Sequence, residues 1–286
     1  MPVSCCPGWD SFEIAPQVTD GPVAFCADLG PASVLGAYKN GIFPFPAADE
    51  YARNINEFRY EDQIAAGEIG VVGSPHDDPF SVAWWSPDPR PVIRVGAVHL
   101  GRNVRKQLRR GHEWTTANHS FRRVAEECRA GREPRWFSDA LLESMVELHE
   151  QGWAHSIEVW QDGDLIGGAL GVGVGRTLSG DSMFSRRPNA ARIAVADMAA
   201  RLARAGGTLI DAQWDSPFLR SLGADLLPRE DYLPLLARSA EHRALPREPL
   251  PARRLIAPGR DGLTPGGTRS CGIRGSRAPS VPGFGH

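Results

Sequence analysis

The 286-residue sequence predicts an α/β (α+β) fold, in which a small N-terminal domain precedes a larger mixed-sheet domain. Three observations support this prediction: a strand–turn–strand pattern that begins at His155, one long amphipathic helix after residue 188, and a short apolar strand after that helix. A strand–helix–strand unit of this kind usually closes right-handed with its strands parallel. We therefore expect functional side chains at the carboxyl ends of these strands.

The expected N-terminal domain spans residues 1–95. The stretch "DLGPASVLGAYKNG" predicts a short helix, with Pro31 in its first turn and an Asn-Gly pair at its end. Residues 46–82 are polar and weakly periodic, which indicates a long loop insertion. The prolines of "WWSPDPRPVIRV" then precede a predicted strand at Val92–Val95.

The expected second domain spans residues 96–240 and alternates helices with strands. Helices are predicted at 102–110, at 119–130 and after Ser138, which we expect to cap its helix. "HSIEVW" and "LIGGALGVGVG" flank an Asp-Gly turn and predict a hairpin, and "TLSGDSMFS" predicts a third strand. The long helix follows, with Asn189 as its expected N-cap.

The final part of the second domain and the C-terminal tail differ in composition. After the strand "GTLIDAQ", the pattern predicts a short helix around Ser216–Leu222 and a last element near Tyr232–Ala237. Residues 241–286 are rich in Pro, Gly and Arg with little apolar periodicity, so we expect a disordered basic tail. The element order hairpin, strand, helix, strand, helix is that of an acetyltransferase-like (GNAT-type) fold.

The composition restricts the class of protein and its compartment. The formal charge of −2 predicts neither nucleic-acid nor acidic partners for the molecule as a whole. The five cysteines are scattered without a CxxC pair, which disfavours a disulfide framework and a zinc site and fits a reducing compartment. The chain begins without a signal-peptide pattern and has no run of 18 apolar residues. We expect a soluble, cytoplasmic monomer without metal or cofactor.

A polar pair follows the apolar strand in "GTLIDAQWD". In an extended strand, Asp211 and Gln213 would point to the same face. A carboxylate beside a carboxamide is suited to orienting and deprotonating an amine and to stabilising a developing oxyanion. The same residue types also commonly hydrogen-bond a loop or cap the next helix. "SGDSMFS" adds a second carboxylate, Asp181.

Six strings occur in one order between Asp28 and Leu236: "AYKNGIFPF", "WWSPDPR", "LHEQGWAHSIEVW", "LSGDSMFS", "NAA" and "LIDAQ…SLGA". Together they resemble the leucyl/phenylalanyl-tRNA–protein transferase family. The resemblance implies an enzyme that moves Leu or Phe from aminoacyl-tRNA to the N-terminal Lys or Arg of a protein, which tags it for degradation. It also implies an acetyltransferase-like domain after a small N-terminal domain.

The same resemblance assigns roles to individual residues. Asp211 and Gln213 match the family's catalytic positions, and Asp181 stands where the family usually has Glu. Ala169 stands where Met is usual in the donor pocket, and Phe45 stands where Trp is usual, so the preference among Leu, Phe and Met is open. The expected tRNA contacts are the following: Arg105, Lys106, Arg109, Arg110 and the stacking residue Trp136.

Two other functions remain open from the sequence. An acyl-CoA-dependent N-acetyltransferase needs a glycine-rich turn at a helix N-terminus to hold pyrophosphate, and "FSRRPNAAR" has no glycine at that junction. A noncatalytic relative that binds tRNA or peptide is the second alternative, because Phe45, Ala169 and Asp181 all depart from the family pattern. A variant of Asp211 would keep every activity of such a protein.

Overall fold

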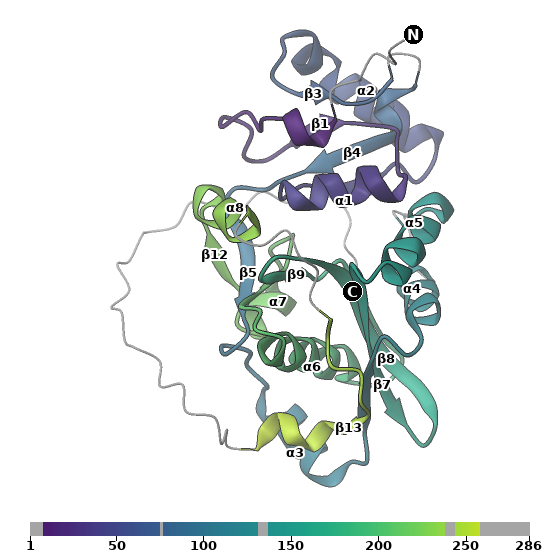
Figure 1. Cartoon of the computed structure of the whole chain (residues 1–286), viewed down its shortest axis with the longest axis vertical. Helices are drawn as coiled ribbons and strands as arrows, with labels where there is room; N and C mark the ends of the chain where they lie inside the picture. The colour runs from purple at the N-terminus through teal and green to yellow at the C-terminus, as the bar shows by residue number, and fades with distance from the viewer. Residues whose placement is uncertain (1–7, 75–76, 131–136, 238–243, 258–286) are drawn as a thin grey trace. The chain divides into compact units, whose positions relative to one another are not determined.

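The computed structural model describes residues 8–74, 77–130, 137–237 and 244–257. The compact unit that holds the helices and strands spans Met1–Ile256 and contains two β-sheets (Figure 1). Helices pack on both sheets, which confirms the predicted α/β (α+β) class. The acetyltransferase-like assignment stays a prediction of the sequence.

The smaller sheet belongs to the N-terminal region and has the strand order β2-β4-β1-β3. Its strands are β1 (Pro22–Phe25), β2 (Phe43–Pro46), β3 (Gly70–Val71) and β4 (Val82–Trp85). A short 3-10 helix, η1 (Trp9–Ser11), precedes it, and α1 (Pro31–Lys39) connects β1 to β2. The predicted first helix is confirmed, with Pro31 in its first turn and Asn40 as its C-cap.

A helix occupies the segment that we expected to be a long loop. Within residues 46–82, α2 spans Glu50–Ala65, and η2 spans Pro79–Ser81. Asp49 caps α2 by accepting from the Ala52 N–H at 2.7 Å. No residue of α2 is fully buried, and only Tyr60 and Ile64 pack on the small core beneath it. The helix therefore lacks the apolar stripe by which a sequence pattern reveals a helix.

The larger sheet has the strand order β12-β5-β11-β9-β8-β7-β6-β13, and β10 pairs with β8 beside this path. Its strands are β5 (Arg90–Arg94), β6 (Trp114–Ala117), β7 (Ala154–Gln161), β8 (Asp164–Val174), β9 (Thr177–Ser179), β10 (Ser182–Ser185), β11 (Leu209–Asp211), β12 (Asp225–Leu227) and β13 (Leu250–Pro251). β5, which we expected in the N-terminal domain, thus pairs with β11 and β12.

Helices cover both faces of the β7–β8 hairpin. The remaining helices are α3 (Arg102–Arg110), α4 (Phe121–Arg129), α5 (Asp139–Glu150), α6 (Ala190–Arg204), α7 (Pro217–Ser221), α8 (Arg229–Ala237) and η3 (Ala252–Ile256). Ile157 and Ala169 share an apolar core with α6, whereas Leu170 and Val172 share another with α4 and α5. Ser138 caps α5 as expected.

The expected third strand is interrupted in its middle. Residues 177–185 form two strands, β9 and β10, separated by Gly180 and Asp181. The Gly180 N–H donates to the Asp211 carbonyl at 2.7 Å, and the Asp181 N–H donates to the Leu170 carbonyl at 3.0 Å. The interruption places Asp181 next to the end of β11, which runs parallel to β9.

Two further expectations were wrong in detail. Asn189 occupies the expected N-cap position of α6, but it has the left-handed conformation (φ 70°), and its side-chain amide donates to Gln107 at 2.9 Å and makes no capping hydrogen bond. Part of the expected disordered tail is ordered, because residues 244–257 include β13 and η3. The remaining residues of the tail lie outside the described part of the chain.

Candidate active site

A buried ion pair lies at the end of β11. The Arg90 guanidinium donates to the Asp211 carboxylate through Nε–Oδ1 at 2.8 Å and through Nη2–Oδ2 at 2.7 Å, and both side chains are 2% exposed. Burial acts to lower the pKa of Arg90, but the charge of Asp211 raises that pKa above its ordinary value. The guanidinium carbon also lies 4.7 Å from the Phe43 ring centroid and 4.9 Å from that of Tyr232. Arg90 is therefore charged and held in one orientation.

The Asp211 carboxylate is surrounded by protein donors. Oδ1 accepts from Arg90 and from the Gln213 backbone N–H at 2.9 Å, while Oδ2 accepts from Arg90 and from the Tyr232 hydroxyl at 2.8 Å. Burial and the charge of Asp211 raise the pKa of Tyr232 well above its ordinary value, so Tyr232 remains a donor. Four donors fill the usual capacity of two carboxylate oxygens. This geometry favours a positioning role for Asp211 over direct deprotonation of a substrate.

Gln213 does not continue the strand, contrary to the extended geometry that we expected. β11 ends at Asp211, and Gln213 adopts a left-handed conformation with φ of 58°. The hydrogen bond from its N–H to the Asp211 side chain closes a tight turn. Such side-chain–backbone bonds replace the backbone hydrogen bonds that would continue a strand. A non-glycine residue in this region of backbone space is strained, and such strain concentrates at functional sites.

The Asp181 carboxylate collects two side-chain donors from distant elements. Its Oδ1 accepts from the Tyr38 hydroxyl of α1 at 2.9 Å and from the Gln213 amide. Its Oδ2 is shielded from solvent and has no hydrogen-bond partner among the described residues. Burial raises the pKa of Asp181 to about 7, although hydrogen bonds to its charged form act in the opposite direction. Asp181 thus titrates near neutral pH, and none of the described residues hydrogen-bonds its Oδ2 within normal geometry.

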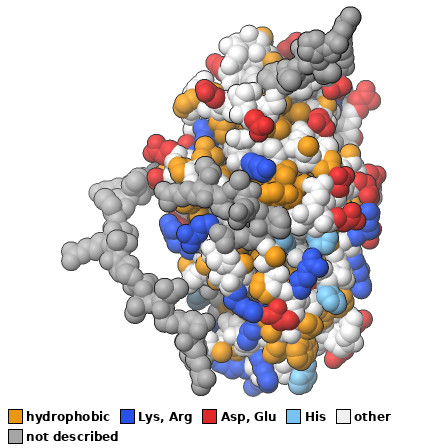
Figure 2. Space-filling view, in the orientation of Figure 1, with side chains coloured by type: hydrophobic (Ala, Val, Ile, Leu, Met, Phe, Trp, Pro, Cys, Tyr) orange, Lys and Arg blue, Asp and Glu red, His pale blue; other side chains and the backbone are white. Residues whose placement is uncertain are grey.

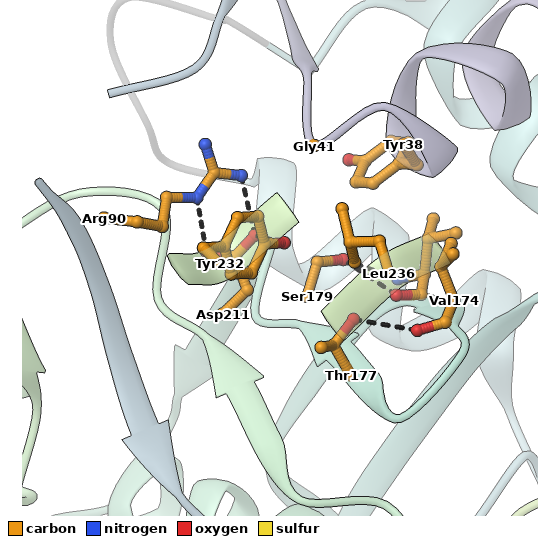
Figure 3. Close-up of a pocket in the computed structure, with 10 residues that line it drawn as sticks. Tyr38, Gly41, Arg90, Val174, Thr177, Ser179, Asp211, Tyr232 and Leu236 are labelled. Atoms are coloured by element: carbon orange, nitrogen blue, oxygen red, sulfur yellow. Dashed lines mark hydrogen bonds and ion pairs between the residues drawn. The ribbon is translucent and has the colours of Figure 1, made fainter. Parts of the chain in front are cut away.

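A small hollow with room for about one water molecule lies beside the Arg90–Asp211 pair, and neither Asp181 nor Gln213 lines it. Arg90, Asp211 and Tyr232 line one part of it, and Tyr38 and Ser179 line another (Figure 3). The second terminal nitrogen of Arg90, Nη1, is buried and forms no hydrogen bond with any described residue. The hollow therefore combines a fixed cation with acceptor groups.

Aromatic rings border the site next to Gln213. The Trp214 ring lies edge-on to three others, with centroid distances of 5.4 Å to Phe43, 6.4 Å to Phe45 and 5.0 Å to Trp85. Trp214 and Phe45 are both half-buried. Phe45 thus packs near Trp214, the residue that follows Gln213, and its place in a donor pocket stays a prediction.

The other predicted site residues lie elsewhere. Ala169 is 1% exposed in β8, where it pairs with Met183 of β10 and packs in the α6 core, and it does not line the hollow. Trp136 lies outside the described residues. The four predicted tRNA contacts are all exposed on α3: Arg105, Lys106, Arg109 and Arg110.

Sequence reasoning missed three residues of the site. Tyr38, Arg90 and Tyr232 come from α1, β5 and α8, which are far apart in the chain. Arg90 closes the string "WWSPDPR", and Tyr38 lies in "AYKNGIFPF", so the family strings contained a signal for both. Nothing in the sequence identified their partners.

The described part of the chain contains neither a candidate metal site nor a membrane-spanning helix. No three His, Cys, Asp or Glu side chains there are grouped so that they could hold a metal ion. Among the same residues, every helix is too short or too polar to cross a membrane.

Comparison with known proteins gives a consistent result. A model of the leucyl/phenylalanyl-tRNA protein transferase family matches residues 92–237. Relatives named leucyl/phenylalanyl-tRNA–protein transferase include one from Shewanella halifaxensis, 39% identical over 233 residues that cover 80% of this chain and 86% of the relative. Another, from Novosphingobium aromaticivorans, is 37% identical over 242 residues, or 84% of this chain and 81% of the relative. The resemblance found in the sequence is thereby confirmed, and the chain belongs to the leucyl/phenylalanyl-tRNA–protein transferase family.

Proposed function

We propose that this protein transfers Leu or Phe, and also Met, from aminoacyl-tRNA to the N-terminal Arg or Lys of acceptor proteins. As a member of its family the protein is an aminoacyltransferase that uses an aminoacyl-tRNA and a protein. The convergence of Tyr38 and Gln213 on the half-buried carboxylate of Asp181 supports the finer proposal. The product would mark its acceptor for degradation.

The reaction requires a positioned donor rather than a covalent nucleophile. The acceptor α-amine attacks the ester carbon of the aminoacyl-tRNA, a new C–N bond forms, and the C–O bond to the terminal ribose breaks. The proton of the amine leaves with the ribose oxygen. The side-chain amide of Gln213 donates a hydrogen bond from Nε2 to the carbonyl oxygen of the aminoacyl ester. This oxygen gains negative charge when the amine attacks. Removing one such donor costs about 10²–10³ in rate.

Asp181 supplies the acceptor specificity in this proposal. Its shielded Oδ2 has no partner among the described residues, and a cationic group of the acceptor would satisfy it. The N-terminal Arg or Lys carries two cations, the α-ammonium and the side chain. An acceptor that begins with Ala lacks the second, and we therefore propose that Asp181 selects the basic side chain.

Asp211 acts through Gln213 rather than on the substrates. Its Oδ1 holds the Gln213 N–H, and Arg90 and Tyr232 hold the carboxylate in turn. Preorganised donors are effective because they do not need to reorient during the reaction. Asp211 and Arg90 are accordingly positioning residues.

Two surfaces would bind the donor. Phe45 and Trp214 border Gln213 and would contact the aminoacyl group or the terminal base by stacking. Ala169 is buried on β8 away from these rings, and we propose that its small side chain relaxes selection among Leu, Phe and Met. The exposed cations of α3 would contact phosphates of the acceptor stem.

A transfer assay tests the proposal directly. Purified protein is mixed with radiolabelled Leu-, Phe- or Met-tRNA and with peptides that begin with Arg, Lys or Ala. We expect label in the Arg and Lys peptides only, and we expect Gln213→Ala to reduce transfer by about 10²–10³. The matched control is Gln151→Ala, which removes an amide at the end of α5 and leaves transfer unchanged. Binding of tRNA without transfer from any donor would contradict the proposal and favour the noncatalytic alternative.

A further inference from the structure

The ordered C-terminal segment, residues 244–257, is attached to the large sheet along its length. Its strand β13 pairs with β6 through Leu250 and Pro251, and the Ala252 N–H donates to the Glu113 carbonyl at 2.9 Å. The Arg254 guanidinium forms an ion pair with buried Asp197 of α6. The segment is thus held by both backbone and side-chain contacts.

A buried arginine fixes the beginning of the segment. Arg201 of α6 is fully buried and donates to the backbone carbonyls of Pro246 and Glu248, the latter at 3.0 Å. The same guanidinium pairs with Asp197 through Nε at 2.6 Å. The Arg201–Asp197 pair of α6 therefore holds residues 246–248 against the helix.

This attachment places η3 against α3. Leu255 and Ile256 pack on the apolar core that includes Val104 and Leu108, the inward residues of α3. The two elements are in contact, and Figure 1 shows them side by side at the lower end of the molecule. The outward face of η3 therefore continues the outward face of α3.

The outward face of α3 is strongly basic. Its exposed cations are Arg102, Arg105, Lys106, Arg109 and Arg110, and the helix contains no acidic residue. In the adjoining η3, Arg254 points inward to Asp197, whereas Arg253 is exposed and forms no ion pair with any described residue. Figure 2, drawn in the orientation of Figure 1, shows several Lys and Arg side chains at the lower end of the molecule, where α3 lies.

We propose that η3 extends the RNA-contacting surface of α3, with Arg253 binding a backbone phosphate of the acceptor stem. This inference rests on the proposed function, which assigns α3 to tRNA. The backbone of a cation on an anchored 3-10 helix is already ordered before binding, so only the side chain has to be ordered when it contacts a phosphate. The contact is electrostatic and independent of base sequence, and it therefore weakens as salt rises.

The test is the salt dependence of tRNA affinity for the full-length protein. Dissociation constants for deacylated leucine tRNA are measured by fluorescence anisotropy from about 50 to about 300 mM KCl. We expect Arg253→Ala to reduce the slope of log K against log salt by about 0.7–0.9, the value for one phosphate contact, and to weaken binding about 3- to 10-fold at low salt. Arg253→Glu should weaken binding further.

Two comparison variants separate the possible outcomes. Arg105→Ala removes a cation of α3 and should reduce the slope by the same amount, whereas Arg59→Ala removes an exposed cation of α2 and should change nothing. If Arg105→Ala reduces the slope but Arg253→Ala does not, the extension is wrong and the assignment of α3 stands. If neither changes the slope, the tRNA surface of the proposed function fails as well. An equal loss for Arg59→Ala would overturn the extension, because any cation would then suffice.

Discussion

Two buried Asp–Arg pairs in this protein differ in how completely their atoms are satisfied. In the α6 pair, Arg201 donates from all three of its nitrogens, and Asp197 accepts from Thr115, Arg201 and Arg254. In the β11 pair, Asp211 is equally well satisfied, but one buried nitrogen of Arg90 has no hydrogen-bond partner among the residues that the structure describes. The first pair joins two segments of the chain, and the second borders the hollow of the candidate active site.

This difference separates a structural from a functional use of the same chemistry. Burying two charges is favourable only when hydrogen bonds satisfy their remaining atoms, and the α6 pair meets this condition through backbone carbonyls of residues 246 and 248. An incompletely satisfied buried cation is costly, and such groups persist chiefly where function requires them. We therefore expect substitutions in the α6 pair to change stability and, through the attached η3, tRNA affinity, but not turnover at saturating tRNA. Substitutions in the β11 pair should change turnover as well as stability.

The largest expected effect follows from breaking the α6 pair. Asp197→Asn leaves the buried Arg201 without its counterion and should reduce the free energy of unfolding by about 3–5 kcal/mol in urea titrations. Turnover at saturating aminoacyl-tRNA should remain that of the wild type wherever the variant is folded. The control is Asp139→Asn, an exposed partner of Arg129, which should change stability by at most about 1 kcal/mol. A loss below that value for Asp197→Asn would show that the pair does not hold the fold.

Breaking the β11 pair sharpens the comparison. Asp211→Asn should also destabilise the protein, because Arg90 stays buried, but it removes in addition the charged acceptor that fixes the Gln213 turn. We expect kcat to fall about 100-fold, since a displacement of about 1 Å in a catalytic group has an effect of this size. The KM for tRNA should change little, because Asp211 does not reach the surface. Unchanged kcat in molecules shown to be folded would rule out the positioning role.

The sequence located the candidate site better than it described its internal contacts. The pattern of an apolar strand with a polar end pointed to Asp211 and Gln213, and the string "SGDSMFS" added Asp181. The structure places the three close together, because β9 and β11 are parallel neighbours. The sequence pattern could not show that Arg90, 121 positions away, forms two hydrogen bonds with the Asp211 carboxylate. Such pairing depends on which elements are adjacent in space, and periodicity carries no information about that.

The missed elements have a common physical origin. α2 has no fully buried residue, and the segment 244–257 is held by ion pairs and backbone bonds more than by an apolar stripe. Periodic hydrophobicity is the main signal for an element in a sequence, so elements stabilised by other contacts are invisible to it. The turn at Gln213 was missed for a related reason, because a side chain of the strand itself closes it.

The smallest expected effect concerns the pH dependence of stability at Asp181. Its pKa is about 7 in the folded protein and about 3.9 in an unfolded chain, so the folded state binds more protons between these values. The free energy of unfolding should therefore decrease as pH rises from about 4 to about 7. Asp181→Asn abolishes this decrease, so its stability relative to the wild type should be higher at pH 8 than at pH 5 by at least about 1 kcal/mol.

Tyr38→Phe tests the cause of this dependence. The Tyr38 hydroxyl donates to Asp181 and favours its charged form, so removing it should raise the pKa of Asp181 and move the decrease in stability to higher pH. Tyr51→Phe, on an exposed tyrosine of α2, is the matched control and should leave the profile unchanged. A profile for Tyr38→Phe that moves to lower pH would mean that the hydroxyl does not stabilise the carboxylate. Ser179 and Gln213 would then be the side chains that favour the charged form of Asp181, and the α1 helix would have no part in setting its pKa.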